Sequence, residues 1–389
     1  MMAAIVKQEP PTPAPQLSHN HHQKQLICDQ LYAASELMLS GNYSHAQGIL
    51  ARLNHHLPSP ISPPHKNPIQ RSGFYFKEAL QMQMAFGMSN SIPTPSNGML
   101  KMCAYKLLSE VSPIIQFMNF TSNQTLLETV GDSDYIHIID FDIGFGAQWA
   151  SFIQELPRKK NNNLNGGCSL KITAFASPST HHPVELGLMH ENLSQVAHEI
   201  GISFELEVVN FDSFDPNSFS VSGNEAVAVN FPVWSTLTHL SAIPSLLHFI
   251  KQLSPRVVVS LDRGCERTDL SFAQYLLNGL QYYEVLLDSI DAAKVPLHTT
   301  NKIEKFLLQP QIESMVMGKL QCPEPMPHWK TLFTAGGYSP VVLSSFSEAQ
   351  ADCVVKRTQV RGFHVEKRHT SLVLCWQNRE LMTASAWKC

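Results

Sequence analysis

The sequence has little that would indicate a metal site or a redox enzyme. Its eight cysteines are scattered, and no two of them stand at the short spacing of zinc ligands or of a catalytic dithiol. Several cysteines have apolar neighbours in the sequence; Cys375, for example, lies between Leu374 and Trp376. We expect these cysteines to be core residues. Unpaired cysteines are typical of a reducing compartment, which indicates the cytosol or the nucleus.

Long apolar runs and an excess of positive charge are absent as well. Residues 1–15 carry prolines and charges where a secretory signal would need an apolar stretch, and no run is long and apolar enough to cross a bilayer. We therefore expect no contact with a membrane. The formal net charge of -4 excludes a general attraction to nucleic acid but is compatible with a local basic patch.

The compact catalytic motifs are also missing. There is no His-Glu-x-x-His run, no phosphate loop that ends in Gly-Lys-Ser/Thr, and no Gly-x-Ser-x-Gly elbow. The pairs His55-His56 and His181-His182 lack further ligands at a useful spacing, so we expect them to be polar surface residues. The sequence therefore predicts no metal site.

Composition divides the chain into three parts. Residues 1–23 are rich in proline, histidine and asparagine, and we expect a disordered tail because little apolar surface offsets the chain entropy. Residues 24–131 predict an α-helical cap with a proline-rich linker near residues 57–70. The apolar stripes of its first two helices, between Ile27 and Leu57, are more typical of a core than of a groove for a partner helix.

The third part, residues 132–389, alternates between strand and helix patterns. Apolar strands are expected at 135–140, 170–175, 203–209, 225–230 and 257–261, with helices at 148–156, 184–200, 237–253 and 270–290. Short strands follow at 362–366, 371–377 and 381–386. This order predicts an α/β fold, a methyltransferase-like Rossmann core with a mostly parallel sheet, a C-terminal antiparallel hairpin and the helical cap. Such a likeness carries no function by itself.

The turn after strand 135–140 is the sharpest feature. Asp142, Gly144 and Gly146 follow the strand and precede a helix, which is how nucleotide-binding turns are built, and the stretch resembles the first motif of S-adenosylmethionine-dependent methyltransferases. Gln148 replaces the third glycine of that motif. The second strand ends in Phe175-Ala-Ser-Pro, without the acid that would hold a ribose. We therefore interpret the turn as vestigial and expect no bound cofactor.

Two carboxylates flank this turn. Asp140 and Asp142 stand two residues apart, and they could serve acid–base chemistry or a metal ion. Alternatively, they accept backbone N–H bonds and fix the loop. We favour this second interpretation because no third ligand recurs nearby.

Five ordered signals resemble the GRAS family of plant transcriptional regulators. Ile136-His137-Ile138-Ile139-Asp140 resembles the VHIID motif, and Ser385-Ala386-Trp387 matches the SAW motif. Residues 27–57 and 183–201 resemble the two leucine-rich regions, and residues 270–291 resemble the PFYRE region. The resemblance covers about nine-tenths of the chain and makes residues 24–389 one GRAS domain. The stretch Val360-Arg-Gly-Phe-His-Val-Glu-Lys367 is similar to the hairy meristem (scarecrow-like) branch, whose long N-terminal extension is almost absent from this sequence.

This resemblance implies a nuclear, non-enzymatic regulator that controls transcription through protein partners. For the hairy meristem branch, those partners include WUSCHEL-type homeodomain proteins and other transcription factors, with a role in meristem maintenance, and a homo- or heterodimer is compatible with it. One alternative is direct, sequence-specific DNA binding, for which the candidate contacts are Arg158, Lys159, Lys160, Lys356, Arg357, Arg361, Lys367 and Arg368. A second alternative is a methyltransferase or a ligand sensor without turnover.

Overall fold

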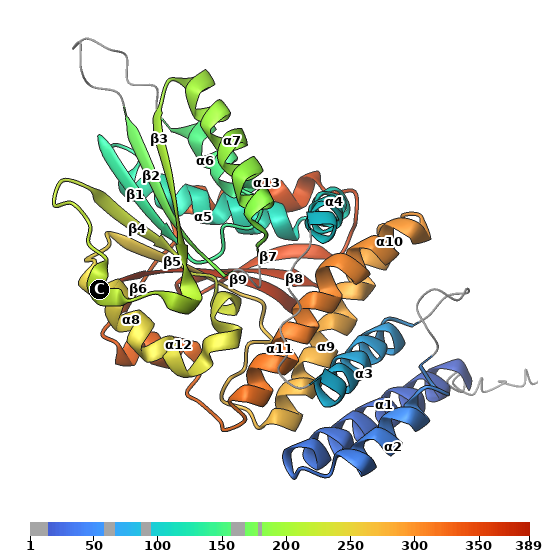
Figure 1. Cartoon of the computed structure of the whole chain (residues 1–389). Coiled ribbons are helices and arrows are strands. Elements are labelled where there is room, and N and C mark those ends of the chain that lie inside the picture. Colours follow the sequence, from blue (N-terminus) through green and yellow to red (C-terminus); the bar gives the residue numbers. More distant parts are fainter. Residues whose placement is uncertain (1–14, 58–66, 87–94, 157–167, 178–180) are drawn as a thin grey trace, which may run out of the picture.

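The computed structural model describes residues 15–57, 67–86, 95–156, 168–177 and 181–389 (Figure 1). Their strands are β1 (Tyr135–Asp140), β2 (Ser169–Ala176), β3 (Ser203–Asn210), β4 (Ala226–Asn230), β5 (Val257–Asp262), β6 (Ser339–Val341), β7 (Phe363–Arg368), β8 (Ser371–Trp376) and β9 (Arg379–Lys388). All nine belong to one sheet in the order β3-β2-β1-β4-β5-β9-β8-β7, and β6 pairs with β9.

The sheet confirms the expected α/β fold. Strands β1 to β5 are parallel, and the order 3-2-1-4-5 is that of a methyltransferase-like Rossmann core. The last three strands run antiparallel and extend the sheet beyond β5. The central strands are almost continuous apolar runs because helices cover both of their faces, whereas β3 at the edge is largely exposed.

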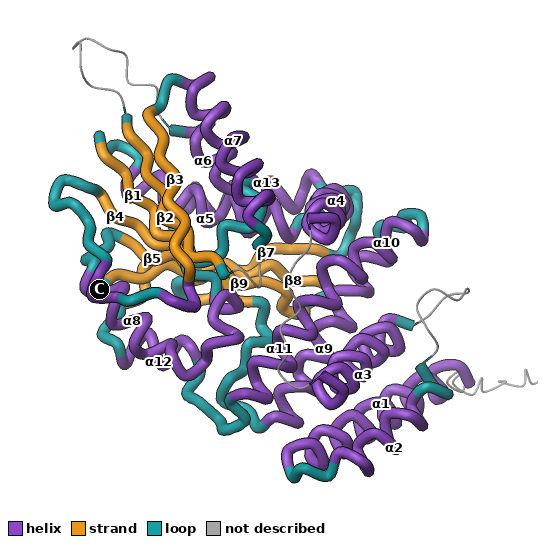
Figure 2. The backbone as a smooth tube through the Cα atoms, in the orientation of Figure 1, coloured by secondary structure: helices purple, strands orange, loops and turns teal. Residues whose placement is uncertain are grey.

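Helices of the core lie in two layers, on either side of the strands that Figure 2 draws in orange. One layer holds α5 (Ile114–Val130), α6 (Ala147–Glu155), α7 (Pro183–Ile200) and α13 (Ser345–Arg357), which contact one another in turn. The other layer holds the 3-10 helix η3 (Val233–Ala242) with α8 (Ile243–Gln252) and α12 (Trp329–Ala335). Two short 3-10 helices, η1 (Phe211–Ser213) and η2 (Pro216–Ser218), follow β3.

The helical cap differs from the sequence expectation. Helices α1 (Pro15–Leu39) and α3 (Pro68–Phe86) pack against α9 (Phe272–Asp291), and α3 also packs against α11 (Gln309–Gln321); both α9 and α11 come from the second half of the chain. Helix α2 (Tyr43–Leu53) packs on α1 and α3. Helix α10 (Leu297–Ile303) and the π-helical turn η4 (Glu304–Leu308) contact α4 (Pro95–Val111), whereas α5 packs on the sheet. The expected cap of residues 24–131 is therefore divided between two layers. The reason is α9, whose side chains are buried on most of its faces, because each apolar face of a helix must pack against another element.

The N-terminal boundary is corrected as well. Helix α1 begins at Pro15, so residues 15–23 of the expected tail are helical, while residues 1–14 lie outside the described part. Most of the linker near residues 57–70 also lies outside it, and α3 begins at Pro68. Proline is compatible with both starts because the first turn of a helix leaves its N–H groups unbonded.

The apolar stripes of α1 and α2 are core, as expected. Ile27 and Leu50 are fully buried, and Leu31 is 1% exposed. Among the described helices, none is long and apolar enough to cross a membrane.

Candidate functional site

The turn between β1 and α6 is built on two glycines with left-handed backbone. Gly144 has φ 52° and Gly146 has φ 74°, a region that other residues rarely adopt. A Cβ on Gly146 would also lie 2.9 Å from Cγ of Met189 on α7. The motif glycines therefore allow the chain to turn sharply and α7 to pack closely against α6.

Asp140 organises this turn from within. Its Oδ1 accepts hydrogen bonds from Asn230 Nδ2 at 2.8 Å and from the backbone N–H of Asp142 at 3.1 Å. Its Oδ2 accepts one from the indole Nε1 of Trp149 at 2.6 Å. Burial raises the pKa of Asp140 to about 7, although these hydrogen bonds oppose the shift. The carboxyl thus ties β1, β4 and α6 together.

Asp142 faces a different set of partners. It accepts a hydrogen bond from Nε1 of Trp234 at 2.7 Å, and the guanidinium of Arg263 lies 4.8 Å from the centre of the same indole ring. We expected both aspartates to accept backbone N–H bonds. With donors from the described residues, Asp140 alone does so, and the other hydrogen bonds that the two carboxylates accept come from side chains.

The two departures from the methyltransferase motif lie at the start of α6 and at the end of β2. Gln148 lies in the first turn of α6, where its backbone carbonyl, which any residue would supply, accepts a hydrogen bond from Asn123 Nδ2 at 2.9 Å. The ring of Phe175 near the end of β2 stacks on Phe141 at 4.7 Å and belongs to a larger aromatic cluster. A carboxylate does reach the end of β2, but it belongs to Asp212 of η1, which accepts a hydrogen bond from the hydroxyl of Ser177.

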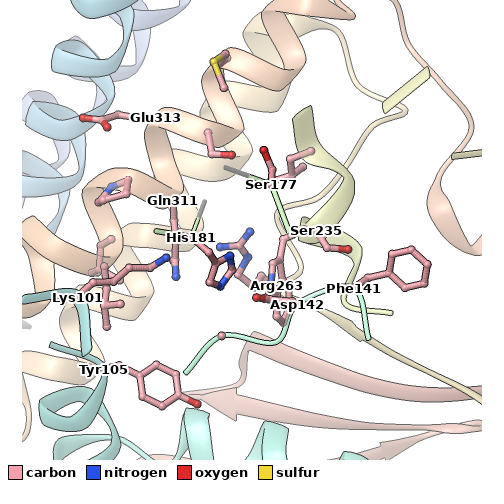
Figure 3. A pocket seen from close by; sticks show the side chains of 18 of the residues that line it. Lys101, Tyr105, Phe141, Asp142, Ser177, His181, Ser235, Arg263, Gln311 and Glu313 are labelled. Atoms are coloured by element: carbon pink, nitrogen blue, oxygen red, sulfur yellow. Dashed lines mark hydrogen bonds between the residues drawn. The ribbon is translucent and has the colours of Figure 1, made fainter. Parts of the chain in front are cut away.

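A cavity of about 980 Å³ opens between these strand ends and the cap. Its wall is mainly apolar, with side chains such as Leu108, Ile115, Met118, Leu286, Leu308 and Met317. Polar side chains from several elements also line it. In Figure 3, Lys101 of α4, His181 before α7 and Arg263 after β5 point toward one another at the centre of the view.

His181 corrects a sequence expectation. It is 9% exposed and lines the cavity instead of the surface. Burial lowers the pKa of His181, and the positive charge of Lys101 lowers it further. Sequence reasoning also missed Lys101 and Arg263, because these two residues and His181 come from three separate elements and share no local motif.

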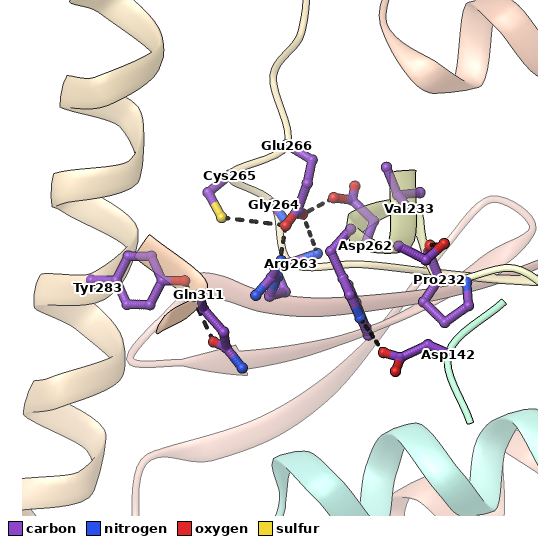
Figure 4. A network of polar contacts seen from close by, with 12 residues as sticks. Asp142, Pro232, Val233, Asp262, Arg263, Gly264, Cys265, Glu266, Tyr283 and Gln311 are labelled. Carbon is purple, nitrogen blue, oxygen red and sulfur yellow. Dashed lines mark hydrogen bonds and ion pairs between the residues drawn. The ribbon is translucent and has the colours of Figure 1, made fainter. Parts of the chain in front are cut away.

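The loop after β5 holds Arg263 in place (Figure 4). Its Nε donates to Glu266 Oε1 at 2.6 Å, and its backbone N–H donates to Glu266 Oε2 at 2.8 Å. The N–H of Gly264 donates to Asp262 Oδ1 at 2.9 Å. Burial raises the pKa of Asp262 well above its usual range, and the charge of Glu266 adds to this shift.

The VHIID and SAW residues are part of the packing. Ile136, Ile138 and Ile139 are buried in β1. His137 bonds Glu225 Oε2 at 2.7 Å and Thr173 Oγ1 at 2.8 Å. The SAW residues lie on β9, which pairs with β5. Ser385, Ala386 and Trp387 stand opposite Ser260, Val259 and Val258. These motifs therefore lie on interior strands of the sheet.

The candidate DNA contacts fall into three groups. Arg158, Lys159 and Lys160 lie outside the described residues. Lys356, Arg357 and Arg361 are exposed near the end of α13. The other two are paired with acids: Lys367 with Glu348 at 2.9 Å, and Arg368 with Glu366 and Glu380 at 2.8 Å each.

The same strands hold one group that could contact a metal ion, within the described residues. His364, Glu366 and Cys375 bring their ligand atoms within 4.8 Å of one another. Arg368 lies among them, with an ion pair to Glu366 and Nη2 at 3.7 Å from Cys375 Sγ. The Arg368 guanidinium thus supplies the positive charge that a metal ion would bring. His364, Glu366 and Cys375 therefore fit a network of ion pairs and hydrogen bonds around Arg368 better than a metal site.

These features define a Rossmann-like α/β protein whose strand-end cavity is covered by a helical cap. A model of the GRAS domain family matches residues 27–388. Scarecrow-like protein 6 of Arabidopsis thaliana is 47% identical over 93% of this chain and 63% of its own length, and Scarecrow-like protein 27 is 44% identical over 94% and 58%. The chain belongs to the GRAS domain family, whose members are plant transcriptional regulators.

The fold agrees with that assignment. The crystal structure of SCL7 from Oryza sativa superposes with a TM-score of 0.69 at 26% sequence identity, over 93% of this chain and 99% of that one. The chain spans about six-tenths of the length of the two Scarecrow-like proteins.

Proposed function

We propose that this protein is a nuclear, non-enzymatic co-regulator of transcription that acts through protein–protein contacts. Its proposed partners are WUSCHEL-type homeodomain proteins and other transcription factors, and its proposed role is meristem maintenance. The observation that carries the proposal is the family match over residues 27–388, together with the Scarecrow-like relatives.

The geometry of the strand ends supports a role without catalysis. A nucleotide cofactor of the methyltransferase type would need a carboxylate at the end of β2, where the chain carries Phe175 in an aromatic stack. The carboxylates of Asp140 and Asp142 already accept hydrogen bonds from the indole N–H groups of Trp149 in α6 and Trp234 in η3. The carboxyl groups that could act as acid or base are thus engaged in holding the loop.

The charge pattern favours protein partners over direct DNA contact. Lys367 and Arg368 are neutralised by neighbouring acids, and the chain as a whole is acidic. An exposed cation that is already paired with an acidic side chain contributes less binding free energy when it contacts a DNA phosphate. Among the candidates in the described part of the chain, direct DNA contact would therefore depend on Lys356, Arg357 and Arg361.

A reporter assay in plant protoplasts tests the proposal. The chain carries a fluorescent tag and is expressed with a WUSCHEL-type homeodomain protein and a promoter that contains sites for that protein. We expect nuclear fluorescence and a change in reporter output that requires both the homeodomain protein and its sites.

The triple variant K356Q/R357Q/R361Q separates the two functions. Under the proposal it changes reporter output as the native chain does, because the homeodomain protein supplies the DNA contact. An effect that persists without the homeodomain protein, and disappears in the triple variant, would support the DNA-binding alternative and contradict the proposal.

A further inference from the structure

The cavity at the strand ends has the size and lining of a small-molecule site. Its volume of about 980 Å³ lies at the upper end of the range of about 300–1,000 Å³ that such sites occupy. The wall is mostly apolar and aromatic, and three basic side chains, Lys101, His181 and Arg263, come together at its centre. A pocket of this kind binds a ligand by its apolar body and orients it by a small number of polar contacts.

Two of these basic side chains carry hydrogen-bond donors that lack acceptors. Within the described residues, the partly exposed Lys101 ammonium makes no hydrogen bond or ion pair; its Nζ lies 5.7 Å from the centre of the Phe145 ring, and its charge acts on His181. The side chain of Arg263 is 7% exposed and uses its Nε for Glu266, while its two terminal nitrogens have no hydrogen-bond partner in the described part of the chain. Charged donors directed into an apolar cavity are costly unless an acceptor completes them.

The acids of the wall do not complete these donors. Each of the three carboxylates already accepts a hydrogen bond from a neighbouring side chain: Asp142 from Trp234, Asp212 from Ser177 and Glu313 from Gln309. No hydrogen bond or ion pair joins these three carboxylates to Lys101 or Arg263 in the described part of the chain, so the donors of Lys101 and Arg263 are available to an acceptor from outside the chain.

We propose that this cavity binds a small molecule with an apolar body and one anionic group, and that Lys101 and Arg263 hold the anion. The planar guanidinium of Arg263, fixed by Glu266 and by the face of Trp234, presents its free edge for a two-oxygen anion such as a carboxylate or a sulfonate. The apolar body lies against α9, η4 and α11, through Leu286, Leu308 and Met317. Because the wall combines core and cap residues, the ligand contacts both parts of the molecule.

Two matched fluorescent probes test the chemical class on the full chain. Anilinonaphthalene sulfonate has an aromatic body with one sulfonate, and phenylnaphthylamine is the same body without the charge. We expect the sulfonate to saturate one site per chain and to bind about tenfold more tightly than the neutral probe, because only the sulfonate can accept charge-assisted hydrogen bonds from Lys101 and Arg263. Equal affinities for the two probes would overturn the proposal.

Lysine variants on one helix locate the anion. K101M should weaken the sulfonate about tenfold and leave the neutral probe unchanged. K106M is the matched control, because Lys106 lies on the same helix and is exposed. If both variants had the same effect on the sulfonate, the anion would not be held at Lys101.

Two further variants guard against a folding artefact. R263M alone would leave Glu266 buried without a partner, so the paired variant R263M/E266Q removes both charges and should also weaken only the sulfonate. S314W places a bulky side chain in the cavity wall and should abolish binding of both probes, whereas S220W on the exposed surface should not. Binding that survives S314W in a folded chain would place the probes elsewhere and refute the site.

Discussion

Replacing Asp140 with asparagine tests whether this carboxyl organises the turn after β1. Asparagine keeps one acceptor oxygen, which can still serve Asn230 and the N–H of Asp142. The NH₂ group of the asparagine, however, would face the indole N–H of Trp149. This indole is fully buried, so its N–H would have no acceptor. An unsatisfied buried donor next to a second donor should lower the free energy of unfolding by about 2–4 kcal/mol at pH 7.

The dependence on pH follows from the same carboxyl. Burial raises the pKa of Asp140 from 3.8 to about 7, so between these values the folded protein holds a proton that the unfolded chain has released. The free energy of unfolding contributed by this group therefore increases as the pH falls through this window, by up to about 1.4 kcal/mol per pH unit. Asparagine does not titrate, and the loss caused by D140N should grow between pH 7 and pH 5.

The assay is urea unfolding followed by far-UV circular dichroism at both pH values. D142N is the matched control, because Asp142 is partly exposed and has one side-chain donor; its cost should stay below about 1 kcal/mol. In a double-mutant cycle, W149F should relieve part of the cost of D140N, since phenylalanine has no N–H. Equal effects of D140N and D142N, with no difference between the pH values, would refute the role assigned to Asp140.

Three further predictions concern the packing and the vestigial turn. L50A should lower the free energy of unfolding by about 2–5 kcal/mol in urea titrations, because Leu50 is fully buried, whereas Y43S, at a position that is 56% exposed, should change it by less than about 0.5 kcal/mol; equal costs would contradict the core assignment. R71M should cost about 3–5 kcal/mol, since it leaves Glu304 buried without its cation, and E304Q in the same chain should restore part of that loss; no restoration would argue against the pair. Calorimetry with S-adenosylmethionine should show no binding, and a saturable signal that G144W removes would restore the enzymatic interpretation.

The fold was predictable from the sequence where one strand or helix carries its own signal. The apolar run of β1 and the alternation of strands and helices up to β5 determine the parallel sheet, and the closely spaced strands from Phe363 onward predict its antiparallel extension. The short strand β6 was missed, because three residues with a proline among them carry no periodic pattern. The start of α1 at Pro15 was missed for the same reason: a proline-rich composition conceals a helix that begins with proline.

The candidate site was predictable only in part. The turn and its two aspartates follow from local spacing, but their partners Trp149, Asn230 and Trp234 belong to other elements. The cluster of Lys101, His181 and Arg263 exists only after the chain has folded, since about eighty residues separate each from the next. His181 was assigned to the surface because its sequence neighbours are polar, although the cavity buries it.

Direct binding between the purified chain and a WUSCHEL-type homeodomain protein is the most decisive measurement. Fluorescence anisotropy with labelled homeodomain protein, run beside labelled DNA over a range of salt concentrations, compares the two partners under the same conditions. The account predicts saturable binding of the homeodomain protein that K356Q/R357Q/R361Q leaves unchanged. No binding of that protein by a folded chain, together with DNA binding that weakens steeply with salt and is lost in the triple variant, would contradict it.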